Sequence, residues 1–147
     1  MRPDQIAENL LEKDYHVADL FPRQVPPERR DAFAAAEQYY LDGSRIHELH
    51  EKFFHILVKL GCYYAMQASA DNGSTWTTDP EPAWFLEQFS RKGFRLLVLI
   101  NQDQALVSAQ DEDTCMAVYG ADDALIDLLK TLCAAEGLYF WKPEHID

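Results

Sequence analysis

The stretch that decides the fold of this chain runs from residue 94 to residue 141: FRLLVLINQDQALVSAQDEDTCMAVYGADDALIDLLKTLCAAEGLYFW. It opens with the nearly continuous apolar run Phe94 to Ile100, which is typical of a central strand covered on both faces. Asn101 to Gln104 then turns the chain into a second predicted strand, Ala105 to Gln110. An acidic turn leads into a third, Thr114 to Tyr119. Consecutive strands joined by short turns favour antiparallel pairing.

The rest of this stretch predicts a helix followed by one more strand. Gly120 breaks the third strand, and Asp122 and Asp123 fall in the first turn of a helix, where the helix dipole favours negative charge. The helix is expected to stop at Gly137, after which Leu138 to Trp141 returns as a final strand. The order β-β-β-α-β predicts a mostly antiparallel sheet with helices packed on it.

The N-terminal part of the chain is predicted to be mainly helical. A short extended segment, Tyr15 to Val25, separates the first predicted helix from the second. The first helix is expected to face inward through Ile6, Leu10 and Leu11. The third is expected to be the most deeply buried, since six apolar side chains repeat on one side of it: Ile46, Leu49, Phe53, Ile56, Leu57 and Leu60. The three predicted helices are Asp4 to about Lys13, Glu28 to Leu41, and Ser44 to about Leu60.

The middle of the chain is expected to add a hairpin and a further helix. Cys62 to Ser69 reads as a strand, and Asp71 to Gly73 as a hairpin turn into a short strand. Thr78 and Glu81 have the spacing of a capping box, which predicts a helix start.

Length and composition place these elements in one folding unit. The chain has 147 residues, of which 48% are hydrophobic and 12% aromatic, enough to bury a core. We therefore predict a single α+β domain over residues 1–147, with a helical layer at about 1–60 and a sheet-forming part at about 61–147.

The charge of the chain is strongly asymmetric. From Asn101 to Asp147 there are ten acidic and two basic residues, a net −8 out of the total of −12. A field of this sign repels nucleic acid and anionic membranes and favours basic proteins or metal cations as partners. The charge therefore predicts a basic protein as partner and excludes the nucleic-acid-binding class.

The predicted topology brings several of these acids to one end of the sheet. The turn at Asp103 and the helix start at Asp122 and Asp123 should share an end, to which the final strand returns with Glu144 and Asp147. A partner-binding role is predicted for Asp103, Asp122, Asp123 and Glu144. The plainer alternative is a solvated surface, since turns and helix starts favour aspartate for local reasons.

A histidine-rich helix segment, HELHEKFFH from His47 to His55, is the candidate metal face. It lacks the zinc-protease pattern, because the fourth position after His47 is Glu51. His47, Glu51 and His55 do recur every four residues, although they drift from the apolar face into solvent. His50 falls within the apolar arc and is expected to be a core histidine bonded to a neighbour. No metal and no cofactor is predicted.

No local motif points to catalysis. Phosphate-binding glycine loops and nucleophile elbows are absent from the sequence, and Cys62, Cys115 and Cys133 have the settings of small core hydrophobes. Three cysteines without a paired spacing fit a reducing compartment. The N-terminus MRPDQIAENLLEKD carries charges where a secretory signal needs an apolar run, so we expect a cytoplasmic protein. Leu96 to Ile100 is far too short for the roughly 20 residues of a membrane span.

The aromatic triplet Tyr139, Phe140 and Trp141 cannot lie in one core, because neighbouring strand residues point to opposite faces. Either helices cover both faces of the final strand, which is the plainer alternative, or one face is exposed. If the strand is a sheet edge, a homodimer through Leu138 to Trp141 is a further hypothesis.

These observations favour a small non-enzymatic interaction protein, of the immunity or inhibitor type, that binds a basic partner through its acidic C-terminal third. The alternative is a small-ligand or divalent-metal-binding enzyme that uses the His47 and His50 helix or the acidic end of the sheet.

Overall fold

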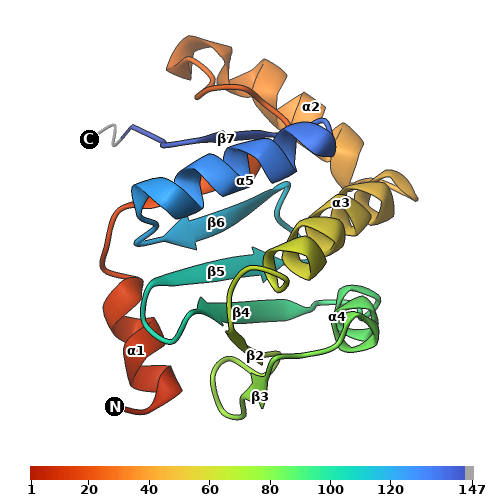
Figure 1. The fold of residues 1–147 in the computed structure, drawn as a ribbon. Helices are drawn as coiled ribbons and strands as arrows, with labels where there is room; N and C mark the ends of the chain where they lie inside the picture. The colour runs from red at the N-terminus through yellow and green to blue at the C-terminus, as the bar shows by residue number, and fades with distance from the viewer. Residues whose placement is uncertain (145–147) are drawn as a thin grey trace.

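The computed structural model describes residues 1–144, and over this range it forms a single α+β domain with one seven-stranded antiparallel sheet (Figure 1). The strands lie in the order β3-β2-β4-β5-β6-β1-β7. They are β1 (Tyr15–Asp19), β2 (Met66–Ser69), β3 (Thr77–Thr78), β4 (Arg95–Ile100), β5 (Ala105–Gln110), β6 (Cys115–Tyr119) and β7 (Tyr139–Trp141). The helices are α1 (Pro3–Leu10), the 3-10 turn η1 (Pro27–Arg29), α2 (Arg30–Leu41), α3 (Arg45–Leu60), α4 (Pro82–Phe89) and α5 (Asp123–Ala135). The predicted α+β class and the C-terminal order β-β-β-α-β are confirmed.

Helices cover the two faces of the sheet unequally. α3 and α5 lie across one face, with α4 beside α3 (Figure 1). On that face Val98 and Val107 enter the main hydrophobic core. Their chain neighbours Leu99 and Leu106 point to the opposite face, where they pack with side chains of α1. The central strand β4 is therefore covered on both faces, as its apolar run predicts.

α3 is the most deeply buried helix, as expected. All six apolar residues predicted to face inward are buried, and the helix is preceded by Gly43 in the left-handed conformation, with φ of 61°. α1 is shorter than predicted, because it ends at Leu10. Leu11 follows as its C-cap and is 43% exposed, so its expected inward position was wrong.

The N-terminal part is more than a helical layer. β1 lies within the sheet between β6 and β7, antiparallel to both, with Ala18 opposite Met116 on one side and Phe140 on the other. The predicted extended segment from Tyr15 to Val25 thus contributes only its first five residues to the sheet. This arrangement depends on pairing between β1 and strands that are distant from it in the sequence, so it cannot be predicted from a local sequence pattern.

The middle of the chain departs most from prediction. β2 begins at Met66, because the residues before it form turns after α3. Thr78 does not cap a helix; it pairs with Gln67 in the hairpin of β2 and β3. The N-cap of α4 is Glu81, with no side-chain capping bond, and Pro82 opens the first turn.

The final strand lies at one edge of the sheet, and the two-residue β3 lies at the other. Phe140 is buried beneath α5, whereas Tyr139 is 49% exposed. The other face of β7 adjoins a pocket that is also lined by the segment after β1 and by the start of α2, as detailed below. Among residues 1–144, none of the helices is both long enough and apolar enough to cross a bilayer.

Candidate functional site

The acidic end of the sheet is assembled much as the strand order implies. The turn between β4 and β5 lies at the same end as the start of α5 (Figure 1), and Gln104 Nε2 donates to Asp122 Oδ2 at 2.8 Å. Asp122 also caps α5, because its Oδ1 accepts from the Leu125 backbone N–H at 2.9 Å. Asp103 and Asp123 are exposed beside it. Asp122 therefore has a structural role, in addition to any role in binding.

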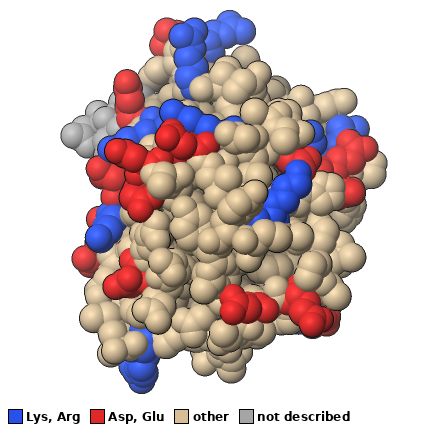
Figure 2. All heavy atoms as spheres, in the orientation of Figure 1, with Lys and Arg blue, Asp and Glu red and all other residues tan. Residues whose placement is uncertain are grey.

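Glu144 follows β7, is exposed, and its backbone N–H donates to Gln24 Oε1 at 2.7 Å. Asp147, the fifth acid expected at this end, lies outside the described residues. Basic groups interrupt the acids here: Lys142 Nζ lies 2.9 Å from Asp14 Oδ2. Figure 2 shows acidic side chains gathered over the start of α5, with basic side chains directly beside them.

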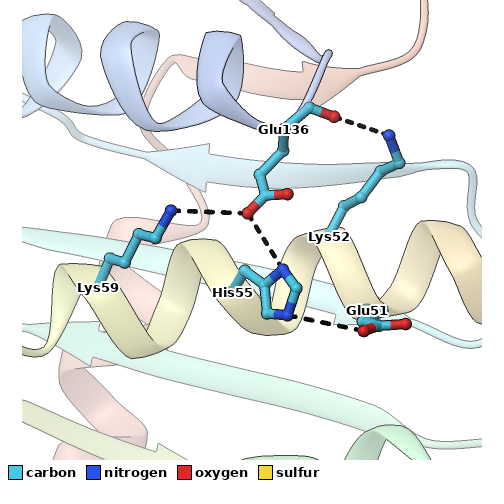
Figure 3. Close-up of polar contacts among 5 residues, drawn as sticks. All are labelled: Glu51, Lys52, His55, Lys59 and Glu136. Atoms are coloured by element: carbon cyan, nitrogen blue, oxygen red, sulfur yellow. Dashed lines mark hydrogen bonds and ion pairs between the residues drawn. The ribbon is translucent and has the colours of Figure 1, made fainter.

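The histidine helix provides an ion-pair cluster centred on His55 and Glu136. His55 Nδ1 lies 3.1 Å from Glu136 Oε1, and His55 Nε2 lies 3.7 Å from Glu51 Oε1 (Figure 3). Lys59 Nζ lies 3.7 Å from the same Glu136 oxygen, and Lys52 Nζ donates to the Glu136 carbonyl at 2.7 Å. These contacts tie the end of α5 to α3.

His47 does not join that cluster. It lines a separate hollow of about 600 Å³ whose lining also includes Arg91, Lys92, Asp111 and Glu112. In the part of the chain that the structure describes, no three His, Cys, Asp or Glu side chains come together in a way that could hold a metal ion. The candidate set His47, Glu51 and His55 is therefore not brought together.

His50 is a core histidine, with 3% of its surface exposed. Its ring packs edge-on against Phe94, with centroids 4.9 Å apart. Asp111 is the neighbour that interacts with the ring, although neither ring nitrogen makes a close hydrogen bond within residues 1–144. Asp111 Oδ1 lies 4.0 Å from Nδ1, and burial lowers the pKa of His50 despite this carboxylate. The ring is accordingly held neutral at neutral pH.

The cysteines differ in setting more than the sequence suggests. Cys62 is exposed, which overturns its assignment to the core, whereas Cys133 is buried and Cys115 half-buried. Burial raises the pKa of the Cys115 and Cys133 thiols to about 12. Neither of these two thiols has the thiolate character that a nucleophile needs.

The feature that the sequence did not reveal is a pocket of about 440 Å³ beside β7. It lies between the ends of β1 and β7, the segment after β1, and the beginning of α2. Four polar residues line it: Asp19, Arg23, Gln24 and Arg30. The remaining lining is apolar and largely aromatic: Phe21, Val25, Pro26, Pro27, Phe33 and Trp141.

Strand register explains why Asp19 and Trp141 meet there. Asp19 pairs with Tyr139 and Val17 pairs with Trp141, so these four side chains point to one face of the sheet. Ala18 points to the other face and enters the main core. Asp19 and Trp141 are thus diagonal neighbours on adjacent strands, close enough for a large aromatic side chain to approach a carboxyl group.

Asp19 is a buried carboxyl group, with 9% of its surface exposed. Removal from water raises its pKa from the usual 3.8 to about 6, and the nearby Glu37 carboxylate adds to the rise. Backbone N–H groups of Phe21 and Leu20 act in the opposite direction. Within residues 1–144 no lysine or arginine forms an ion pair with it.

Trp141 supplies an unsatisfied polar group. Its indole Nε1 is buried and has no hydrogen-bond partner among the described residues. A pocket with apolar walls and a few polar groups is the usual form of a small-ligand site, and a carboxyl group with a shifted pKa strengthens that assignment. No family model, curated protein or solved structure matches this chain.

Proposed function

We propose that this protein is a non-enzymatic binding protein, of the immunity or inhibitor type, that docks on a basic protein through the acidic end of its sheet. The docking residues are Asp103, Asp122, Asp123 and Glu144. The partner would be held by charge complementarity around the start of α5. Such a field speeds encounter and weakens as salt is added.

One observation carries this proposal. The carboxylates of Asp103 and Asp123 are exposed and make no hydrogen bond or ion pair with the rest of the described chain. Other acids are already neutralised by bases, as in the pairs Glu87 with Arg91 and, at the acidic end itself, Asp14 with Lys142. The two aspartates lie beside the Asp122 cap in a protein of net charge −12, and they remain available to an external cation.

The test is a pull-down from native lysate at low and at physiological salt, with bound proteins identified by mass spectrometry. The double variant Asp103→Lys, Asp123→Lys should lose a basic partner that the wild type retains at low salt. Asp122 is left intact in this variant, because it caps α5.

A matched control is Glu8→Lys, Glu48→Lys, which makes the same change in net charge at exposed positions on α1 and α3. This control should retain the partner. If both double variants lose the partner to the same degree, net charge and not the acidic end is responsible; if both retain it, the docking surface is wrong. A partner that is acidic or insensitive to salt would also contradict the proposal.

The position of β7 at a sheet edge favours a second candidate, self-association of two copies through Tyr139–Trp141. Light scattering over a range of protein concentrations tests it. A mass that rises toward twice 16.9 kDa with concentration would support a dimer, and a constant 16.9 kDa would exclude it.

A further inference from the structure

We propose that the pocket beside β7 binds a small zwitterion of the amino-acid type, with its ammonium group at Asp19, its carboxylate at Arg23 and Arg30, and its apolar side chain between the aromatic walls. This site adjoins the acidic end of the sheet through Gln24, which accepts from the Glu144 backbone N–H, but the inference does not depend on the proposed docking function. It also uses none of the histidines considered above.

The first step in the argument is the buried carboxyl group. Asp19 lines the pocket and is 9% exposed, yet no cation of the described chain neutralises it. Burial of an unpaired carboxylate costs free energy, which the raised pKa of Asp19 records. An ammonium group that enters the pocket would supply the missing partner. Glu37, whose charge is also felt at Asp19, adds to the attraction for a cation.

The second step is the pair of guanidinium groups. Arg23 and Arg30 both line the pocket and are exposed, and neither forms an ion pair with a carboxylate within residues 1–144. In a protein with 25 acidic and 13 basic residues, two available arginines at one hollow favour a ligand with an anionic group. Guanidinium groups bind carboxylates through paired N–H donors, which fixes orientation as well as charge.

The third step is the wall between these charges. Phe21, Phe33 and Trp141 are aromatic, and Val25, Pro26 and Pro27 complete an apolar lining. The phenyl rings of Phe21 and Phe33 lie 5.5 Å apart between centroids, so they form one continuous aromatic surface. A volume of about 440 Å³ lies within the range of sites that bind small ligands. A ligand with charged groups only would leave this surface unused.

The pocket carries both an acidic group and two basic groups, and this combination favours one class of ligand over the others. A simple cation would leave both arginines unmatched, and a simple anion would be repelled by Asp19 when it is ionised. A zwitterion with an apolar body satisfies both groups at once. The buried indole N–H of Trp141, which has no acceptor among the described residues, is a further polar group that a ligand acceptor would satisfy.

The test is isothermal titration calorimetry with four probes: L-phenylalanine, L-leucine, phenethylamine and 3-phenylpropionate. At least one of the two amino acids should bind, and about tenfold or more tightly than either phenethylamine or 3-phenylpropionate, since each lost charged hydrogen-bonded contact costs on that scale. Absence of binding by both amino acids would overturn the proposal. So would equal affinity for an amino acid and for 3-phenylpropionate, since Asp19 would then have no role.

Variants separate the two ends of the ligand. Asp19→Asn should weaken the amino acid about tenfold or more and leave 3-phenylpropionate unweakened, whereas Arg23→Gln, Arg30→Gln should weaken each of the three probes that carry a carboxylate. The matched controls are Asp31→Asn and Arg29→Gln, which alter exposed neighbours that do not line the pocket. Controls that lose binding to the same degree as the pocket variants would overturn the assignment.

The same titration distinguishes this inference from the docking function. The double variant Asp103→Lys, Asp123→Lys should bind the amino acid as the wild type does, because neither residue lines the pocket. Circular dichroism of Asp19→Asn should show an unchanged fold, since the substitution keeps the size of the side chain and removes a buried charge.

Discussion

The pKa values of two aspartates in this protein are shifted in opposite directions, and the contrast shows what sets the charge state of a carboxyl group. Asp71, in the loop between β2 and β3, has its pKa lowered to about 2, because the Thr75 hydroxyl and backbone N–H and the Ser69 hydroxyl donate to it. Asp19, in the pocket beside β7, has its pKa raised to about 6 by removal from water. Hydrogen-bond donors determine the first value, and desolvation determines the second.

The two sites also differ in how the chain builds them. The partners of Asp71 lie within four residues of it: Thr75 Oγ1 donates at 2.6 Å and Ser69 Oγ at 2.8 Å. The surroundings of Asp19 come from distant parts of the chain, including Glu37 on α2 and Trp141 on β7. A loop can provide hydrogen-bond donors for its own carboxylate. In a pocket formed by separate elements, a carboxylate can be left without a cationic partner.

The largest effect is expected from Asp19→Asn, which should change how the free energy of unfolding depends on pH. Because the folded-state pKa of Asp19 exceeds 3.8, the folded protein binds this proton more tightly than the unfolded chain does. Its contribution to stability is full below pH 3.8 and is lost as pH rises through about 6. Over that interval the wild type should lose roughly 3 kcal/mol that Asp19→Asn does not lose. Urea unfolding at several pH values measures the difference.

The control for this measurement is Asp31→Asn, an exposed aspartate on α2. It should retain the pH dependence of the wild type. Parallel curves for the wild type and Asp19→Asn would show that desolvation does not control Asp19.

The next effect in size is expected from Ser69→Ala. The Ser69 hydroxyl is buried, donates to Asp71 Oδ1 and accepts from the Gly73 N–H at 2.8 Å. Its removal leaves that N–H without its side-chain acceptor, at a cost of roughly 1–2 kcal/mol. Chemical unfolding at neutral pH measures the loss. Ser74→Ala, at an exposed position in the same loop, is the control and should be close to neutral.

Asp71→Asn should have a smaller effect, with the opposite pH dependence to Asp19→Asn. A lowered folded-state pKa stabilises the protein above pH 3.8, and this stabilisation is lost as pH falls through about 2. The variant should therefore melt below the wild type at neutral pH, and the two melting temperatures should converge in strong acid. A gap that widens in acid would contradict the role assigned to the loop donors.

The smallest effect is expected from Glu136→Gln. This variant tests whether a carboxylate contributes much to stability merely because its partners are distant in the sequence. Glu136 meets His55 and Lys59 across a long chain separation, as Asp19 meets its neighbours, but those two partners are 41% and 49% exposed. Such near-surface ion pairs contribute about 0.2–1 kcal/mol. Thermal unfolding at low and high salt should show a small loss that salt removes. A loss as large as that from Ser69→Ala would mean that the link between α3 and α5 is stronger than its exposure implies.

Elements with a strong local pattern were predictable from the sequence. The span of β5, Ala105 to Gln110, and the inward face of α3 agree with prediction. The patterns that indicate them involve only residues close together in the sequence. The capping box at Thr78 was wrong, because pairing with Gln67 in the sheet outweighed a local preference. Cys62 was misplaced for a similar reason: the apolar pattern continued past the end of α3, but the chain turned there.

Of the two candidate sites, one could be predicted from the sequence and the other could not. The shared end of Asp103 and Asp122 could be predicted, because consecutive antiparallel strands alternate in direction. The pocket could not, since nothing near Asp19 in the sequence shows that β1 will lie beside β7. Its apolar lining also includes residues that, taken locally, read as a proline-rich connection: Val25, Pro26 and Pro27.

The position of β1 within the sheet has a consequence for how the protein is made. Its register partners are Cys115–Tyr119 and Tyr139–Trp141, so β1 cannot find either neighbour until nearly the whole chain has left the ribosome. The hairpins of β4, β5 and β6 join residues that are close in sequence and are able to form earlier. We expect β1 to join the sheet only after β6 has been made, and β7, which pairs with β1, to join after that. Until β1 joins, the apolar edge of β6 remains open to chaperones and to other nascent chains.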